Sequence, residues 1–126
     1  MLTISVSVGE AIDKFSVLLV KKRMVQSEEK RQFILDEIEY LTKDLGKETL
    51  ETFAVDIAEL DAINTAIWIE EDKIRDFIDN DKFDQEFIEC ASAIPKLNDL
   101  RFVIKNRINI RNDSAIKEQK QHKSRI

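Results

Sequence analysis

The chain has 126 residues, of which 43% are hydrophobic and 36% are charged, and its net charge is −5. This length predicts one domain, and the apolar fraction is enough for a hydrophobic core. With only two glycines and one proline, the chain lacks the turn residues that a sheet or barrel of many strands needs. The acidic balance argues against specific binding of nucleic acid.

Membrane insertion and secretion are not indicated. No apolar run approaches the roughly 18 residues that a membrane-spanning helix needs. The first eight residues lack the basic region and the long apolar stretch of a signal peptide. We therefore expect a cytoplasmic protein.

The chain opens with an alternating pattern. Leu2, Ile4 and Val6 are separated by polar residues, which predicts a short strand over residues 2–6. A lone strand leaves its backbone groups unpaired, and no second good strand follows. We expect this strand to pair with that of a second copy.

Two helices are predicted next, over about 8–25 and 28–45. Ser7 and Glu10 form a capping box at the start of the first helix. Ser27 is suited to cap the second helix, and Gly46 follows it where a glycine commonly ends a helix.

Two longer helices, over about 48–78 and 84–111, follow. Their apolar residues recur alternately four and three apart, which is the heptad spacing of a coiled coil. Residues 79–82 are typical of a turn. The fold class is therefore all-α: a long antiparallel helical hairpin packed with two shorter N-terminal helices and preceded by one short strand.

We expect residues 1–113 to form the helical domain and residues 114–126 to form a basic, flexible tail. This tail carries Lys117, Lys120, Lys123 and Arg125 against a single acidic residue, Glu118. Contact of the tail with nucleic acid or anionic lipid is the alternative to a solvated end.

Antiparallel pairing across the predicted turn brings together residues whose numbers sum to about 162. Asn64 should then face Asn98, and Asp61 should face Arg101, with Trp68 and Asp99 within one turn. A buried polar pair of this kind fixes the helix register, whereas the same residues could instead form the floor of a small ligand site. Acidic residues should also face basic ones along the hairpin: Glu48, Glu51, Asp56 and Glu59 against Lys105, Arg107 and Arg111.

A second candidate site comprises Glu10, Asp13 and Lys14 on the first turns of the first helix. Capping by Glu10 and the preference of Asp13 for a helix N-terminus provide a structural explanation for both.

Residues for catalysis or metal binding are scarce. The only histidine, His122, lies in the expected tail, and the only cysteine, Cys90, lies beside an apolar stripe and is interpreted as a buried, inert thiol. Carboxylates at Glu70, Glu71, Asp72 and Asp76 lack the spacing of helical pyrophosphohydrolases and are interpreted as a solvated face. We predict no catalytic residue, no metal and no cofactor.

Four segments resemble a family of short bacterial and phage proteins known as domain of unknown function 6165. They are Ile4–Lys14, Glu59–Arg75, Phe83–Glu89 and Asn98–Asn109, in this order. The resemblance implies no established activity, and it implies an association with sugar-transferase and surface-polysaccharide genes. It marks these motif positions as candidates for ligand binding: Glu10, Asp13, Lys14, Asn64, Trp68, Asp72, Arg75, Asn98, Asp99 and Arg101.

The leading hypothesis is a non-enzymatic interaction or scaffold protein that acts as a homodimer. Apolar residues off the heptad stripes, Val17, Leu18, Ile63 and Phe102, indicate a further contact surface. The alternative is a helical enzyme or a binder of a small sugar or nucleotide that uses Asp61, Asn64, Asn98, Asp99 and Arg101. A closed, dry contact among these side chains favours the first hypothesis, and a solvent-filled cleft favours the second.

Overall fold

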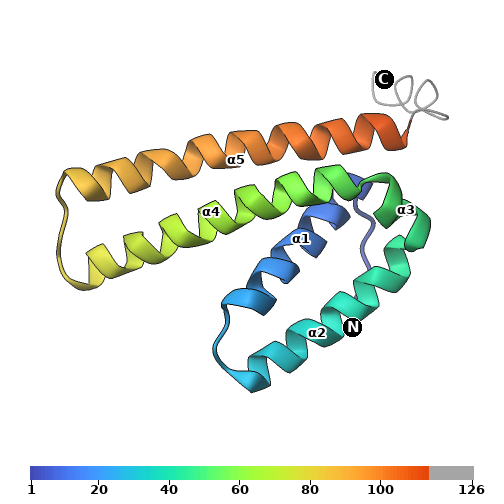
Figure 1. The fold of residues 1–126 in the computed structure, drawn as a ribbon, viewed down its shortest axis with the longest axis horizontal. Helices are drawn as coiled ribbons and strands as arrows, with labels where there is room; N and C mark the ends of the chain where they lie inside the picture. Colours follow the sequence, from blue (N-terminus) through green and yellow to red (C-terminus); the bar gives the residue numbers. More distant parts are fainter. Residues whose placement is uncertain (114–126) are drawn as a thin grey trace.

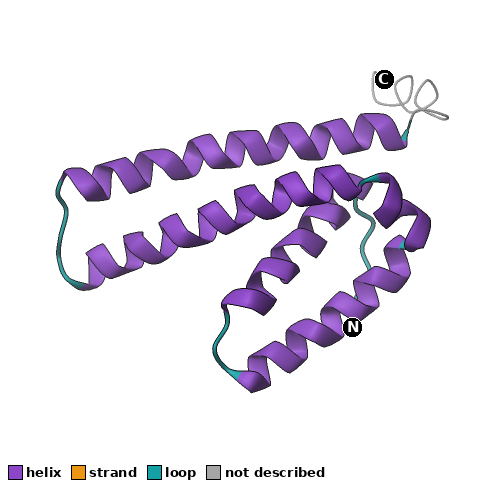
Figure 2. Cartoon of the chain, in the orientation of Figure 1, coloured by secondary structure: helices purple, strands orange, loops and turns teal. Residues whose placement is uncertain are grey.

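The structure is a computed structural model that describes residues 1–113, and within this range its regular secondary structure is all α-helix (Figures 1 and 2). The prediction of an all-α protein is confirmed. The helices of the described part are α1 (Val8–Met24), α2 (Glu28–Leu45), α3 (Lys47–Thr52), α4 (Ala54–Asp79) and α5 (Gln85–Asn112). The expected basic tail, residues 114–126, lies outside the described residues, and so does His122.

The predicted N-terminal strand over residues 2–6 is absent, so this prediction is wrong. Leu2 and Ile4 are exposed, and residues 1–7 form an irregular segment that precedes α1. A strand needs a neighbour for its backbone hydrogen bonds, and residues 1–113 provide none. The alternating pattern therefore has no sheet to join within the described chain.

Local side chains begin α1 and α2. The Ser7 hydroxyl accepts a hydrogen bond from the Glu10 amide (3.1 Å), and Ser27 accepts one from the Lys30 amide (3.3 Å). Each serine satisfies one of the backbone amides that the first turn of a helix leaves unpaired. Arg31 of α2 also holds the turn between α1 and α2, because its guanidinium donates to the carbonyl oxygens of Lys22 and Val25 at the end of α1.

The third predicted helix, over 48–78, is interrupted. Short α3 ends at Phe53, whose backbone (φ −105°, ψ 23°) separates it from α4. The Phe53 side chain is 3% exposed and belongs to the core. Burial of this ring explains the break, because the change of direction turns Phe53 into the core while α3 packs against the preceding helix, α2.

The connection between α4 and α5 is a Schellman turn. The amide of Lys82 donates to the carbonyl of Phe77 (2.8 Å), and the amide of Asp81 donates to that of Ile78 (3.1 Å). Asp81 adopts the left-handed conformation (φ 51°), which Asp tolerates better than most residues. Asp84 then caps α5 by accepting from the amides of Glu86 and Phe87.

α4 and α5 lie side by side and run in opposite directions, while α1 packs against both and α2 packs against α1 (Figure 1). The central core lies where α1 meets the two long helices, and its buried members are Ile12, Phe53, Leu60, Ile104 and Ile108. α1 approaches α5 closely at Gly9. A Cβ on this residue would overlap the carbonyl oxygen of Lys105 and lie 2.8 Å from Oδ1 of Asn109. Only glycine permits this contact.

Two of the apolar residues that we expected on a contact surface differ in their burial. Leu18, which we expected to be exposed, is 3% exposed and packs inside, whereas Phe102 is 67% exposed. None of the helices within residues 1–113 combines the length and apolar character needed to cross a membrane.

Candidate functional site

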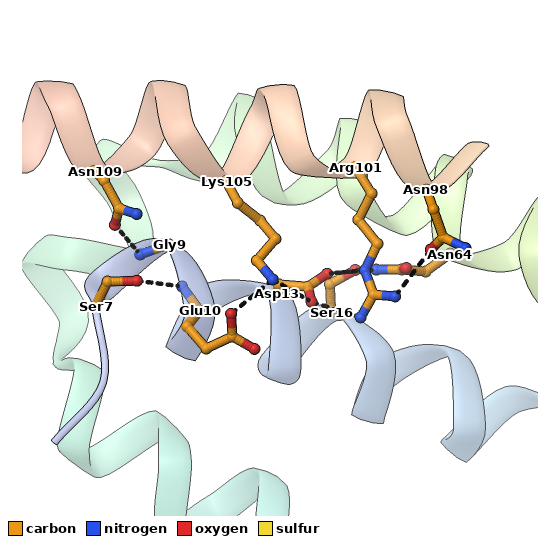
Figure 3. A network of polar contacts seen from close by, with 10 residues as sticks. All are labelled: Ser7, Gly9, Glu10, Asp13, Ser16, Asn64, Asn98, Arg101, Lys105 and Asn109. Carbon is orange, nitrogen blue, oxygen red and sulfur yellow. Dashed lines mark hydrogen bonds and ion pairs between the residues drawn. The ribbon is translucent and has the colours of Figure 1, made fainter. Parts of the chain in front are cut away.

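The main polar cluster is centred on Asp13 of α1, where α1 crosses α4 and α5 (Figure 3). Asp13 is 1% exposed. Arg101 of α5 binds its carboxylate with two hydrogen bonds, from Nε to Oδ1 (2.9 Å) and from Nη2 to Oδ2 (2.6 Å). This bidentate geometry is the strongest pairing available to the two groups.

Asn64 of α4 completes the cluster from the opposite side. Its Nδ2 donates to Oδ1 of Asp13 (3.1 Å) and to Oγ of Ser16 (3.2 Å), and its side chain is 5% exposed. Ser16 is fully buried one turn after Asp13 on α1. A small hydroxyl residue at this position leaves room for Asn64 and gives it a second acceptor.

The cluster extends along α5 to the N-terminus of α1. Lys105 Nζ lies 2.6 Å from Oε2 of Glu10 and 3.8 Å from Oδ2 of Asp13. One turn further, Asn109 Oδ1 accepts a hydrogen bond from the Gly9 amide (2.7 Å). We refer to Glu10, Asp13, Ser16, Asn64, Arg101 and Lys105 as the Asp13 network.

Electrostatics favour the charged form of Arg101. Its hydrogen bonds to Asp13 raise its pKa above the ordinary value; partial burial opposes the rise, and the charges of Asp13, Glu10 and Glu71 add to it. Because a raised pKa in the folded state stabilises the protein at every pH below the ordinary value, the Arg101 guanidinium contributes throughout the physiological range.

The Asp13 network is closed. Among residues 1–113, no buried side-chain nitrogen or oxygen is left without a hydrogen-bond partner. The Asp13 carboxylate is buried and already accepts hydrogen bonds from Arg101 and Asn64, so it is poorly placed to take a proton from a substrate. In the described part of the chain, no group of three or more His, Cys, Asp or Glu side chains is arranged to hold a metal ion.

The structure separates the residues that the sequence singled out. Glu10, Asp13, Asn64 and Arg101 belong to the Asp13 network, and Asn98 touches its edge, with Oδ1 3.5 Å from Nη1 of Arg101.

The other candidates lie apart from this network. Asp61 pairs with Arg23 of α1 (2.7 Å), and Asp72 forms an exposed ion pair with Arg75 in the same helix (3.3 Å). The remaining three do not share one site: Trp68 is half-buried on α4, whereas Lys14 and Asp99 are exposed on α1 and α5.

The two predicted cross-hairpin pairs are wrong. Asn64 donates to Asp13 and Ser16 rather than to Asn98, and Arg101 binds Asp13 rather than Asp61. The reason is that α1 lies along the seam between the long helices. Asp13 and Ser16 of α1 bind Asn64 of α4, and Asp13 also binds Arg101 of α5. These contacts take the place of direct ones between α4 and α5.

A second ionic cluster surrounds Asp56 near the other end of the core. The Asp56 side chain is 2% exposed and binds both Arg107 and Arg111, the latter at 2.8 Å. Arg107 also reaches Glu59 (3.0 Å), and the guanidinium of Arg111 lies 5.0 Å from the ring centre of Phe53. Of the predicted acidic and basic partners, Asp56 and Glu59 do face Arg107 and Arg111, whereas Lys105 turns to α1.

Several contributors were missed at the sequence level, namely Ser16, Arg23, Lys105 as a partner of α1, and Asn109. The burial of Ser16 could have been predicted from the sequence, because Ser16 lies one helical turn after Ile12 on the apolar side of α1. A polar residue on such a face predicts a buried hydrogen bond.

An apolar groove lies on the described surface and shares none of its lining residues with the Asp13 network. This groove has a volume of about 390 Å³ and runs between α4 and α5. Its lining residues are Glu59, Ala62, Ile63, Leu100, Val103, Ile104 and Arg107. With two oppositely charged residues at one end and aliphatic side chains elsewhere, it fits an apolar surface better than a polar metabolite.

Comparison with known proteins adds one relationship. No curated protein and no solved structure matches the chain. The model of a family of unknown function, DUF6165, matches residues 2–126, which is almost the whole chain and includes every residue of the Asp13 network. The resemblance found in the sequence is thereby confirmed, and the chain belongs to the DUF6165 family.

Proposed function

We propose that this member of a family of unknown function is a non-enzymatic interaction or scaffold protein that acts as a homodimer. The observation that carries this proposal is the closure of the Asp13 network, where the candidate ligand-binding residues that do meet are satisfied by one another. In this proposal the buried polar groups fix the position of α1 on the long helices. Their role is conformational specificity, as for buried polar residues in coiled coils.

The exposed surface supports the second part of the proposal. Large aliphatic side chains remain uncovered along the two long helices, including Ile69 (44% exposed), Leu100 (54%) and Val103 (59%). A rigid pair of antiparallel helices with an uncovered apolar face is a common basis for protein association. The heptad spacing of both helices is compatible with packing of the coiled-coil type.

The charge of the chain and its family resemblance bear on its partner and its cellular role. The acidic balance of the chain favours a protein partner over nucleic acid, and we place the protein in the cytoplasm. The resemblance noted in the sequence favours a role linked to surface-polysaccharide synthesis. Sub-micromolar binding of a nucleic acid at physiological salt, retained after deletion of residues 114–126, would contradict the first of these proposals.

The direct test is the mass of the protein in solution. Light scattering coupled to size exclusion should give about twice the chain mass of 14.7 kDa at micromolar concentration. A mass of 14.7 kDa at concentrations up to about 100 µM would refute the homodimer. The dimer Kd would then lie above about 100 µM, which is too weak for a stable dimer.

A further inference from the structure

One broad face of the α4–α5 pair has no cover in the described structure. Helical periodicity turns it away from α1, which packs on the opposite side through Asn64, Arg101 and Lys105. We call it the outer face. Its apolar members are Val55, Ala62 and Ile69 on α4 and Leu100, Val103 and Ile110 on α5, and the apolar groove lies at its centre.

These apolar residues form one stripe on each helix. On α4 they are seven residues apart, and on α5 they are three and seven apart, which keeps each stripe on one side of its helix. The aliphatic side chains of Val55, Ile69, Leu100, Val103 and Ile110 are between 44% and 71% exposed. A continuous stripe of this kind in contact with water is typical of an interface.

The charges on the outer face indicate which partner it fits. Glu59 of α4 lies level with Arg107 of α5, since the two form an ion pair at 3.0 Å. Further along, the rings of Phe77 on α4 and Phe87 on α5 pack together, with their centroids 6.5 Å apart. Lys73 precedes Phe77 by four residues and Glu89 follows Phe87 by two, so these two charges lie within one turn of the same level. In the first pair the acidic residue is on α4 and in the second pair it is on α5, so the order of these charges is reversed between the two helices.

Such an arrangement is complementary to itself. A two-fold axis parallel to the long helices places α4 of one copy against α5 of the other, antiparallel and at the same level. Glu59 then meets Arg107 of the second copy, and Lys73 meets Glu89 of the second copy. Glu89 forms no ion pair with any residue from 1 to 113, so this contact would give it a partner.

We propose that the outer face binds the outer face of a second copy about this axis, forming a four-helix bundle from two α4–α5 pairs. The proposal rests on the homodimer suggested above and specifies its surface. The size is adequate: from Val55 to Lys73 the face is about 27 Å long, and two adjacent helices are about 20 Å wide. This is about 500 Å² of projected area per copy, which gives the roughly 1,000 Å² in total that a specific interface needs.

The first test replaces apolar residues of the outer face. The double variant Leu100→Glu with Val103→Glu should raise the dimer Kd at least about 100-fold, because four carboxylates enter the interface. Both side chains are more than half exposed in the subunit, so its fold should persist. Phe102→Glu is the matched control, since Phe102 is 67% exposed on the same helix but points away from the outer face.

The second test uses charge reversal. Lys73→Glu places like charges against Glu89 of the second copy and should raise the dimer Kd about tenfold, since two symmetric pairs are lost and replaced by repulsion. Glu89→Lys should act similarly, and the double variant Lys73→Glu with Glu89→Lys should restore dimerisation. Sedimentation equilibrium measures all the Kd values, and circular dichroism verifies the fold of each variant.

The outcomes separate this inference from the proposed function. A wild-type monomer would refute the homodimer itself. A stable wild-type dimer that is unaffected by Leu100→Glu with Val103→Glu, or that dissociates with Phe102→Glu instead, would leave the homodimer intact but overturn the outer face as its surface. Dissociation by both single charge reversals without rescue in the double variant would overturn the proposed two-fold axis.

Discussion

Arg101→Met is the most informative change in the Asp13 network. It removes both hydrogen bonds that the guanidinium makes to Asp13 and keeps most of the aliphatic stem. The carboxylate of Asp13 then stays in a site where its side chain is only 2% exposed, so water cannot replace the lost donors. Two partners remain, the Asn64 amide at 3.1 Å and the Lys105 ammonium at 3.8 Å.

The magnitude follows from these contacts. Breaking a buried ion pair by removing one partner costs about 3–5 kcal/mol, and the remaining Lys105 places the expected loss near 3 kcal/mol. Asp13→Asn should cost less, about 1–2 kcal/mol, because the Arg101 side chain is 29% exposed and can be hydrated. The double variant Asp13→Asn with Arg101→Met should be more stable than Arg101→Met alone, since it no longer contains an uncompensated buried charge.

Urea denaturation at one protein concentration, followed by circular dichroism, measures these differences. Arg75→Met is the matched control, because Arg75 forms an exposed pair with Asp72 and its loss should cost less than about 0.5 kcal/mol. An Arg101→Met variant as stable as this control would refute the reasoning. Asp13 would then be accessible to water, and a ligand site in the network would become the better interpretation.

Three further changes test other parts of the structure. Gly9→Ala should destabilise the protein by about 1–3 kcal/mol in thermal or urea melts, because its Cβ overlaps the backbone of α5 at Lys105; unchanged stability would contradict the close approach of α1. Gly46→Ala should cost about 1–3 kcal/mol through strain alone, since Gly46 has φ 84° and no atom within 4 Å of an added Cβ; a neutral result would mean that another backbone conformation is accessible. Hydrogen bonding to Glu70 raises the pKa of the Cys90 thiol, so Glu70→Gln should lower this pKa and speed alkylation by iodoacetamide at neutral pH, and an unaltered pH profile of the rate would exclude the contact.

The local features of this protein could be predicted from short stretches of sequence. The Ser7 and Ser27 caps depend on side chains and amides three residues apart, so the sequence contains all the information they need. The scarcity of glycine and proline and the helical spacing of apolar residues likewise indicate an all-α fold. The family is recognisable for the same reason, since its motifs are contiguous segments.

The tertiary structure decided where α1 lies, and with it the partners of the polar residues. Asp13 and Arg101 are 88 residues apart, and their pairing depends on the close approach of α1 to α5 that Gly9 permits. A hairpin of the two long helices alone would pair Asn64 with Asn98, but α1 lies on their seam and supplies Asp13 and Ser16 as the partners of Asn64. The N-terminal strand failed for a related reason: alternation of apolar residues defines which side chains share a face, but a strand forms only where another strand supplies its hydrogen bonds.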